Sequence, residues 1–188
     1  MFSKFRSAIL GYKVKNISIN GVKISTSYKG KRPSSDPLAI LKELKVKLNQ
    51  NATAVPVTLD FSKYWEDRLG YLEGIHPSAT SKFQIDNRHY RISRFVTKQN
   101  RSPLSIYTFS NNDKIFALFS RVYDYGNYFK EIENDLISNY NLRVSESDMN
   151  LYHLTNQKYY ALVDVFGHSQ SFVWNDKEEL DKCLGSFV

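Results

Sequence analysis

Alternating apolar and polar residues mark the first clear element of the chain. The runs 12–19 and 22–28 alternate in this way, which is typical of β-strands with one buried face. Asn20-Gly21 lies between them and supplies the positive φ angles of a type I′ turn. The pattern predicts a β-hairpin with Val14, Ile17 or Ile19, Val22 and Ile24 on one face, and with Lys13, Lys15 and Lys23 on the other face or at the edge. These lysines either block edge-to-edge association or belong to a binding surface.

Helical periodicity replaces the alternation after residue 36. Leucines recur from Leu38 to Leu48 at helical spacing, and Asp36-Pro37 provides a side-chain cap followed by a first-turn proline. This predicts a helix that runs to about Asn49. Residues 52–61 then predict a strand, and Pro56 within it favours an edge strand or a bulge. Ser62 is expected to cap a second, shorter helix.

The remaining alternating runs predict three more hairpins. Residues 82–98 predict two strands that turn at Asp86-Asn87. Residues 104–109 and 114–123 form the next pair, joined by a polar turn. The last pair is 158–166 with 169–174.

Helices are expected at 126–137 and 145–153, and again at the C-terminus. Asp176, with Glu179 three residues later, resembles a capping box, and Gly185 is placed to end this final helix. Strand pairs with short helices between them, without regular strand-helix alternation, predict an α+β fold. The expected architecture is a mainly antiparallel sheet built from hairpins, with three to five short helices packed on it.

The length of 188 residues is typical of one domain, so residues 1–188 are expected to form a single α+β domain. Any subdivision would lie near 99–103, where the charge balance changes. Residues 1–101 carry 19 Lys and Arg against 7 Asp and Glu, whereas residues 102–188 carry 7 against 12. The first half is therefore basic and the second mildly acidic.

Several kinds of chemistry lack their usual motifs. The four histidines, His76, His89, His153 and His168, are too far apart for a zinc motif, and no phosphate-binding glycine loop or Gly-x-Ser-x-Gly elbow is present. Asp36 with Glu43-Leu44-Lys45 matches the letters of a metal-dependent nuclease. However, the helix predicted there turns Glu43 and Lys45 to different faces. We expect no metal and no cofactor.

The cysteine content and the apolar runs of the chain indicate its location. Cys183 is the single cysteine, so no internal disulfide is possible. No apolar run is long enough to cross a bilayer, and the first residues do not form the apolar region of a signal peptide. We expect a cytoplasmic protein without a membrane partner.

Positive charge concentrated along one half of a chain favours an anionic partner, most commonly nucleic acid. The strongest candidates lie in the loop after the first hairpin and in the segment 82–98. The predicted phosphate contacts are Lys29, Lys31, Arg32, Arg88, Arg91 and Arg94. His89 and Tyr90 are expected to add hydrogen bonds or stacking. The preferred function is a non-catalytic binding protein with a basic face for nucleic acid, RNA or DNA, or for a nucleoprotein complex.

Two alternatives remain open at this level. Tyr123, Tyr125 and Tyr128 lie among acidic residues and suit a protein-protein contact, as in an inhibitor or adaptor from a phage or mobile element. A metal-independent endoribonuclease would use His89 as acid or base beside the arginines. Nucleic-acid binding further requires the separate basic segments to share one face.

Overall fold

The chain folds around one long β-sheet with helices on both of its sides. The computed structural model describes residues 11–30, 37–49, 54–57, 61–99, 102–122, 150–154, 160–164 and 169–187. Within these ranges the sheet has ten strands in the order β1-β2-β4-β5-β6-β7-β10-β9-β8-β3. Neighbouring strands are antiparallel except for β3 and β8, which run parallel.

The element bounds follow the expected hairpins closely. The strands are β1 (Tyr12–Ile19), β2 (Val22–Lys29), β3 (Ala54–Val57), β4 (Ala79–Ile85), β5 (Arg88–Gln99), β6 (Ser102–Asn111), β7 (Lys114–Val122), β8 (Asn150–Leu154), β9 (Tyr160–Asp164) and β10 (Ser169–Trp174). The described helices are α2 (Pro37–Asn49), α3 (Phe61–Gly70) and α5 (Lys177–Gly185). The fold is thus broadly α+β, mostly antiparallel sheet with few helices.

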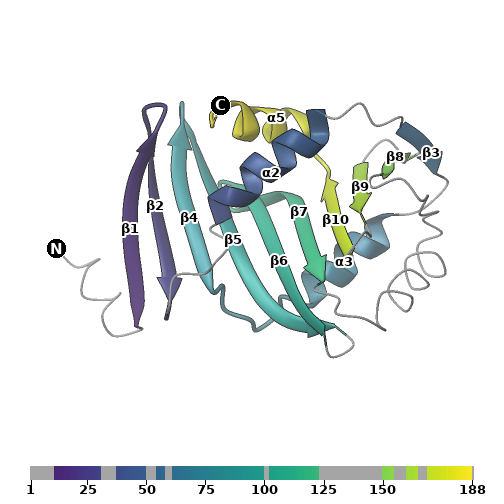
Figure 1. Ribbon diagram of the computed structural model, residues 1–188, viewed down its shortest axis with the longest axis horizontal. Coiled ribbons are helices and arrows are strands. Elements are labelled where there is room, and N and C mark those ends of the chain that lie inside the picture. Colours follow the sequence, from purple (N-terminus) through teal and green to yellow (C-terminus); the bar gives the residue numbers. More distant parts are fainter. Residues whose placement is uncertain are drawn as a thin grey trace.

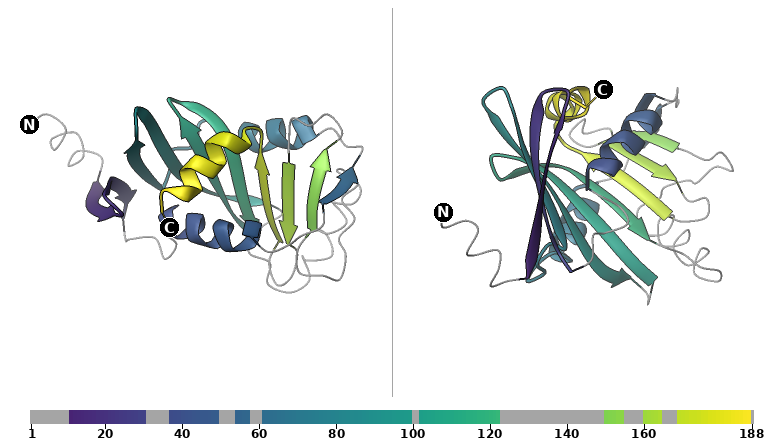
Figure 2. Two further views of the ribbon diagram at one scale, coloured as in Figure 1. Left: turned by 90° about the horizontal axis from the view of Figure 1, so that it is seen from above. Right: turned by 60° about the vertical axis from the view of Figure 1, so that its left-hand side comes forward.

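The helices form two layers around the sheet. Helices α2 and α5 cross the same face (Figure 1), where α2 packs against β4, β5 and α5, and α5 packs against β7. Helix α3 lies on the opposite side, near β6, β7 and β10 (Figure 2). We call the side under α2 and α5 the covered face.

The main hydrophobic core fills the space between the covered face and its two helices. Helix α2 contributes Ile40, Leu41 and Leu44, and α5 contributes Leu180, Cys183 and Leu184, all of them buried. The sheet contributes mainly aromatic rings, whose packing favours tilted and edge-to-face contacts. These are Phe83, Tyr90, Tyr107, Phe109, Phe116, Phe119, Phe172 and Trp174.

Tight turns hold the hairpins in register, as expected from their sequences. Asn20 and Gly21 have φ angles of 49° and 79°, and Asp86 has 52°. The turn between β6 and β7 is shorter than expected and consists of Asn112 and Asp113, with φ angles of 46° and 68°. Asn and Asp tolerate this left-handed backbone better than other non-glycine residues, which is why these sites turn the chain.

Three sequence expectations are corrected. The helix expected at 145–153 is contradicted at its end, where β8 pairs with β9 and β3. Helix α3 begins at Phe61, so Ser62 lies inside it. In the first hairpin, Ile17, Ile19 and Val22 pack against the core whereas Val14 is 53% exposed. The region 126–137 and Asp36 lie outside the described residues.

The prediction that Pro56 lies in an edge strand is confirmed, because β3 is the last strand of the sheet.

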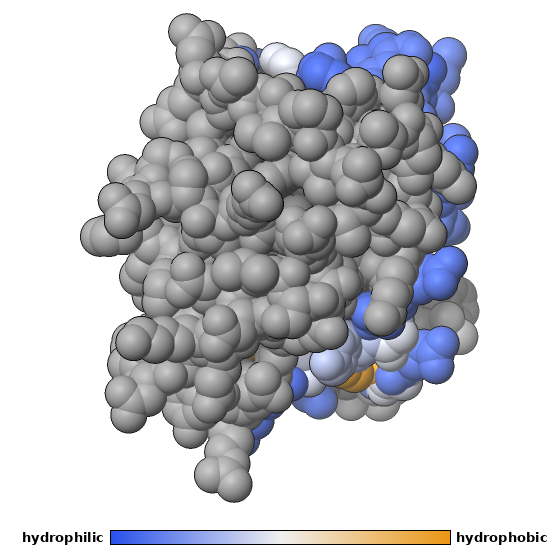
Figure 3. All heavy atoms as spheres, turned by 90° about the vertical axis from the view of Figure 1, so that its right-hand side faces the viewer, coloured by the Kyte–Doolittle hydropathy of each residue, from blue (hydrophilic) through white to orange (hydrophobic). Residues whose placement is uncertain are grey.

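On the side of the molecule where β3 lies, the described residues that reach the surface are mostly hydrophilic (Figure 3). No helix in the described part of the chain has both the length and the apolar character needed to cross a membrane.

Candidate nucleic-acid interface

Side-chain alternation divides the basic residues of the strands between two faces. Ile24, Phe83 and Tyr90 are register neighbours on β2, β4 and β5, and all three belong to the core. Residues that flank them in sequence point to the opposite face, because successive side chains of a strand alternate. This rule places the following residues together: Lys23, Lys82, Gln84, His89 and Arg91.

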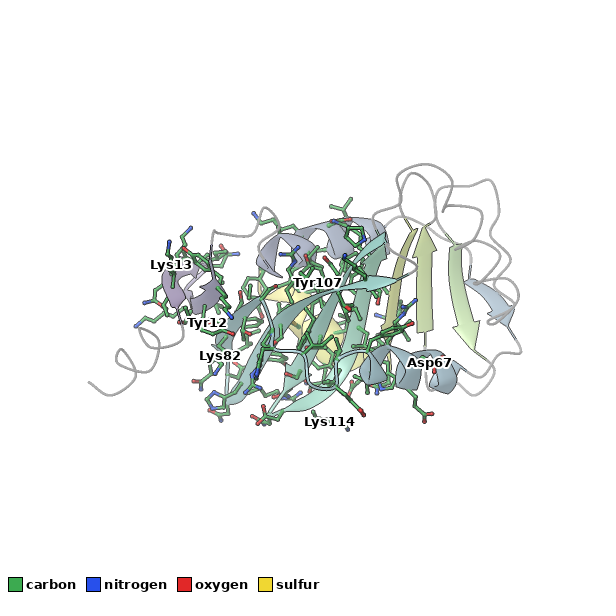
Figure 4. The ribbon with its side chains drawn as sticks, turned by 90° about the horizontal axis from the view of Figure 1, so that it is seen from below. Tyr12, Lys13, Asp67, Lys82, Tyr107 and Lys114 are labelled. Carbon is green, nitrogen blue, oxygen red and sulfur yellow. The ribbon has the colours of Figure 1, made fainter. Side chains whose placement is uncertain are left out.

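We call this surface of β1, β2, β4 and β5 the open face, because no described helix covers it there (Figure 2). Lys29 lies on the same face, three positions after Thr26, whose side chain is buried toward the core side. Lys23, Lys29, Lys82 and His89 are exposed, and Arg91 is half-buried. Figure 4 shows Lys82 on the side of the sheet away from α2, whereas Tyr107 points toward α2.

The first seven strands carry basic residues and no acidic ones. Every charged side chain in strands β1 to β7 is a Lys or an Arg. On the covered face the helices supply the opposite charge. Arg88 forms an ion pair with Glu179 of α5, and Arg121 forms one with Glu43 of α2.

The open face has no such helix above it. Among the described residues its one recorded ion pair joins Arg91 to Asp113 of the neighbouring turn, with 2.7 Å between Nη2 and Oδ1. Within the part of the chain that the structure describes, no carboxylate forms an ion pair with Lys23, Lys29 or Lys82. Lys23, Lys29 and Lys82 of the open face therefore keep their charge free for a ligand, whereas Arg88 and Arg121 of the covered face are paired with helix carboxylates.

A pocket of about 460 Å³ lies at the end of the open face where β4 turns into β5 and β6 into β7. It is lined by Lys82, Phe83, Gln84, His89, Tyr90, Arg91, Asn112 and Asp113. The backbone N–H of Asn112 donates to the carbonyl oxygen of His89 at 3.0 Å, which joins the two turns at this point. The pocket thus combines cationic, imidazole and amide side chains.

Tyr90 does not take the role expected from the sequence. Its side chain is only 2% exposed, stacks on Phe83 with 5.5 Å between ring centroids, and donates a hydrogen bond to Glu179 Oε2 at 2.8 Å. Burial raises the pKa of the Tyr90 hydroxyl above its usual value. A ring enclosed in this way has no free face for a base, so the expectation of stacking by Tyr90 is corrected.

The other candidate residues fall into three groups. Arg88 and Arg94 lie on the covered face, where Arg88 pairs with Glu179 and Arg94 donates to Ser105 Oγ at 3.4 Å. Lys29, His89 and Arg91 lie on the open face. A third group lies outside the described residues: Lys31, Arg32, Tyr123, Tyr125 and Tyr128.

Lys82, Gln84 and Asn112 were not singled out by the sequence, although the structure places them with His89 and Arg91. Lys23 was named in the first hairpin but was not among the predicted phosphate contacts. The signal that identifies most of them is alternation around a large apolar residue. If Ile24, Phe83 and Tyr90 are taken as buried, their sequence neighbours must lie on the other face. Asn112 comes close only because two separate turns meet.

The described residues contain no cluster of three His, Cys, Asp or Glu side chains that could hold a metal ion. Cys183 is buried in the core, and burial raises the pKa of its thiol to about 12. A thiol in this state is a poor nucleophile. Comparison with known proteins found no matching family model, no matching curated protein and no matching solved structure.

Proposed function

We propose that this protein binds nucleic acid through the open face, mainly by contacts with phosphates, and does not cleave it. The observation that supports this proposal is the combination of exposed lysines, strands without acidic residues and the lack of a described covering helix. Positive charge of this kind attracts a polyanion and releases its counterions on binding.

The geometry also suits an extended ligand. Lys82 and Arg91 are register partners on β4 and β5, and Ser25 of β2 pairs with Lys82 on the other side. Side chains in such a row lie about 5 Å apart across neighbouring strands. Ser25, which is exposed beside Lys82 in this row, offers a further hydrogen-bond donor to phosphate oxygens.

The test compares two sets of substitutions with equal changes in net charge. The open-face set is Lys23→Gln, Lys29→Gln and Lys82→Gln. The control set is Lys13→Gln, Lys15→Gln and Lys42→Gln, whose lysines are also exposed. Lys13 and Lys15 share the side of Ile17, and Lys42 belongs to α2. Fluorescence anisotropy with labelled mixed-sequence RNA and DNA gives affinities between about 50 and 200 mM salt.

The open-face variant should lose on the order of tenfold or more in affinity at about 50 mM salt. The slope of its log affinity against log salt should become shallower by about 2 to 3, because three phosphate contacts are lost. The control variant should change little. Equal losses in both variants would mean that net charge alone matters, and lack of binding by the unmodified protein would overturn the proposal.

The catalytic alternative is separated by a second measurement. Metal-independent RNA cleavage needs both a general acid and a general base, and His89 is the one histidine that lines the described pocket. We expect labelled RNA to stay intact when it is incubated with the protein in EDTA. Cleavage that disappears in His89→Ala and persists in His76→Ala would assign catalysis to the pocket instead.

A further inference from the structure

The pocket at the end of the open face offers more than positive charge. We propose that it holds one nucleotide of a single-stranded nucleic acid, with the phosphate on Lys82 and Arg91 and the base against Gln84 and Asn112. This inference rests on the proposed function and names the class of nucleic acid that the open face binds. The volume of about 460 Å³ lies within the range of roughly 300–1,000 Å³ that is usual for small-ligand sites.

Lys82 and Arg91 form the phosphate-binding side of the pocket. They are register partners on neighbouring strands and point to the same face. One guanidinium nitrogen of Arg91 is engaged by Asp113. Because a guanidinium carries five N–H donors, others remain for a phosphate oxygen. The ion pair also holds the Arg91 side chain beside the pocket.

The amide side chains of Gln84 and Asn112 supply hydrogen-bond acceptors, which a phosphate group cannot use. Gln84 Nε2 donates to the backbone oxygen of Asp86 at 2.9 Å, and no partner is recorded for Gln84 Oε1 among the described residues. The side chain of Asn112 has no recorded hydrogen bond there either. Phosphate oxygens only accept hydrogen bonds, so an amide oxygen contributes nothing to a pure phosphate site. Nucleobase edges carry both donors and acceptors and match these amides.

Access to the base edge is what favours a single strand. In a duplex the bases are paired and stacked, and moving one into a pocket costs a few kcal/mol of lost pairing and stacking. In a single strand the edges and faces are already available, and proteins that read them use amide, aromatic and imidazole side chains. His89, which is exposed at the pocket, is placed to contact the base as well.

Fluorescence anisotropy with one oligonucleotide of about 12 nucleotides, used as a single strand and as a duplex, tests the inference. The informative variants are Gln84→Ala and Asn112→Gly, since glycine keeps the positive φ of 46° at that turn position. Asn16→Ala is the matched control, because Asn16 is exposed on the open face of β1 but does not line the pocket.

The unmodified protein should prefer the single strand by about tenfold at about 50 mM salt. Gln84→Ala and Asn112→Gly should each lower this preference severalfold without changing the salt slope, and Asn16→Ala should behave like the unmodified protein. A free nucleoside monophosphate should compete weakly, because it lacks the other phosphate contacts of the open face.

Different outcomes overturn different proposals. Equal affinity for single strand and duplex, or an unchanged preference in Gln84→Ala, overturns the nucleotide pocket and leaves binding by the open face standing. A free nucleoside monophosphate that binds more tightly than the strand overturns the assignment to a polymer. Lack of binding to either form overturns both proposals.

Discussion

Glu179 is the residue that connects the C-terminal helix to the basic strands. Its carboxylate accepts hydrogen bonds from Tyr90 Oη at 2.8 Å and from Asn111 Nδ2 at 2.9 Å, and it forms an ion pair with Arg88. The side chain is 14% exposed. A carboxylate with several donors in a shielded place stabilises a fold more than an exposed one does.

We expect Glu179→Ala to lower the free energy of unfolding by about 2–3 kcal/mol, because the Tyr90 hydroxyl and the Arg88 guanidinium lose their partner. Chemical denaturation measures the change. Glu178→Ala is the control from the same helical turn, since Glu178 contacts only exposed Lys182 among the described residues. A similar loss in both variants would contradict the role given to Glu179.

Asp113 competes for one of the proposed phosphate contacts. We expect Asp113→Asn to raise nucleic-acid affinity about two- to fivefold at low salt, since Arg91 is released from an exposed ion pair. Asp86→Asn is the matched control, because it removes the same charge at another turn position with positive φ. Equal gains in the two variants would attribute the effect to net charge, and the salt-dependent binding assay distinguishes these results.

Helix α5 is positioned by its N-terminal cap, Asp176, and by its contacts with the aromatic residues of the sheet. Asp176 accepts a hydrogen bond from the backbone N–H of Glu179 at 3.0 Å, as the sequence predicted. Only half of the expected capping box forms, because the Glu179 side chain turns to Tyr90 and Arg88 instead. The buried face of α5 then carries Cys183 into the core.

This burial makes stability depend on pH at the alkaline end. The thiol pKa of Cys183 is about 12 in the folded protein against about 9 when exposed. A raised folded pKa means that the contribution is complete below pH 9 and is lost as the pH rises toward 12. Between these limits unfolding releases a proton, so stability should fall by ~1.4 kcal/mol per pH unit through this group.

Cys183→Ala removes that group. We expect its free energy of unfolding to decline less steeply between pH 9 and 11 than that of the unmodified protein, by about this amount per unit. Urea denaturation at several pH values measures the two slopes. Identical slopes would show that Cys183 is not enclosed by α5 and the sheet.

At the scale of the whole molecule, the two halves of unequal charge are joined in one sheet. Strand β5 pairs with β6 along ten register positions, and Phe83 packs edge-to-face on Phe187 at 4.9 Å between centroids. We predict that residues 1–101 alone do not fold, because β5 would lose β6 and the core would lose α5. Circular dichroism during thermal denaturation tests this, and a cooperative transition in the fragment would instead support two domains near 99–103.

The sequence by itself determined the local elements. Alternation and turn residues such as Asn20-Gly21 and Asp86-Asn87 were sufficient for the hairpins, and Pro37 and Asp176 for two helix starts. These signals work because strand alternation, left-handed turns and caps depend on residues within a few positions of each other. They failed at β8, whose strand conformation depends on pairing with segments distant in sequence.

Only the tertiary structure decided which basic residues share a surface. Arg88 and His89 are neighbours in sequence, yet Arg88 meets Glu179 under α5 whereas His89 is exposed on the open face. Alternation assigns the two residues to opposite faces, but it does not say which face the helices cover. The covered face is set by packing between β5 and a helix some ninety residues later in the chain. For this reason the count of charges along the sequence did not show which basic residues share an exposed surface.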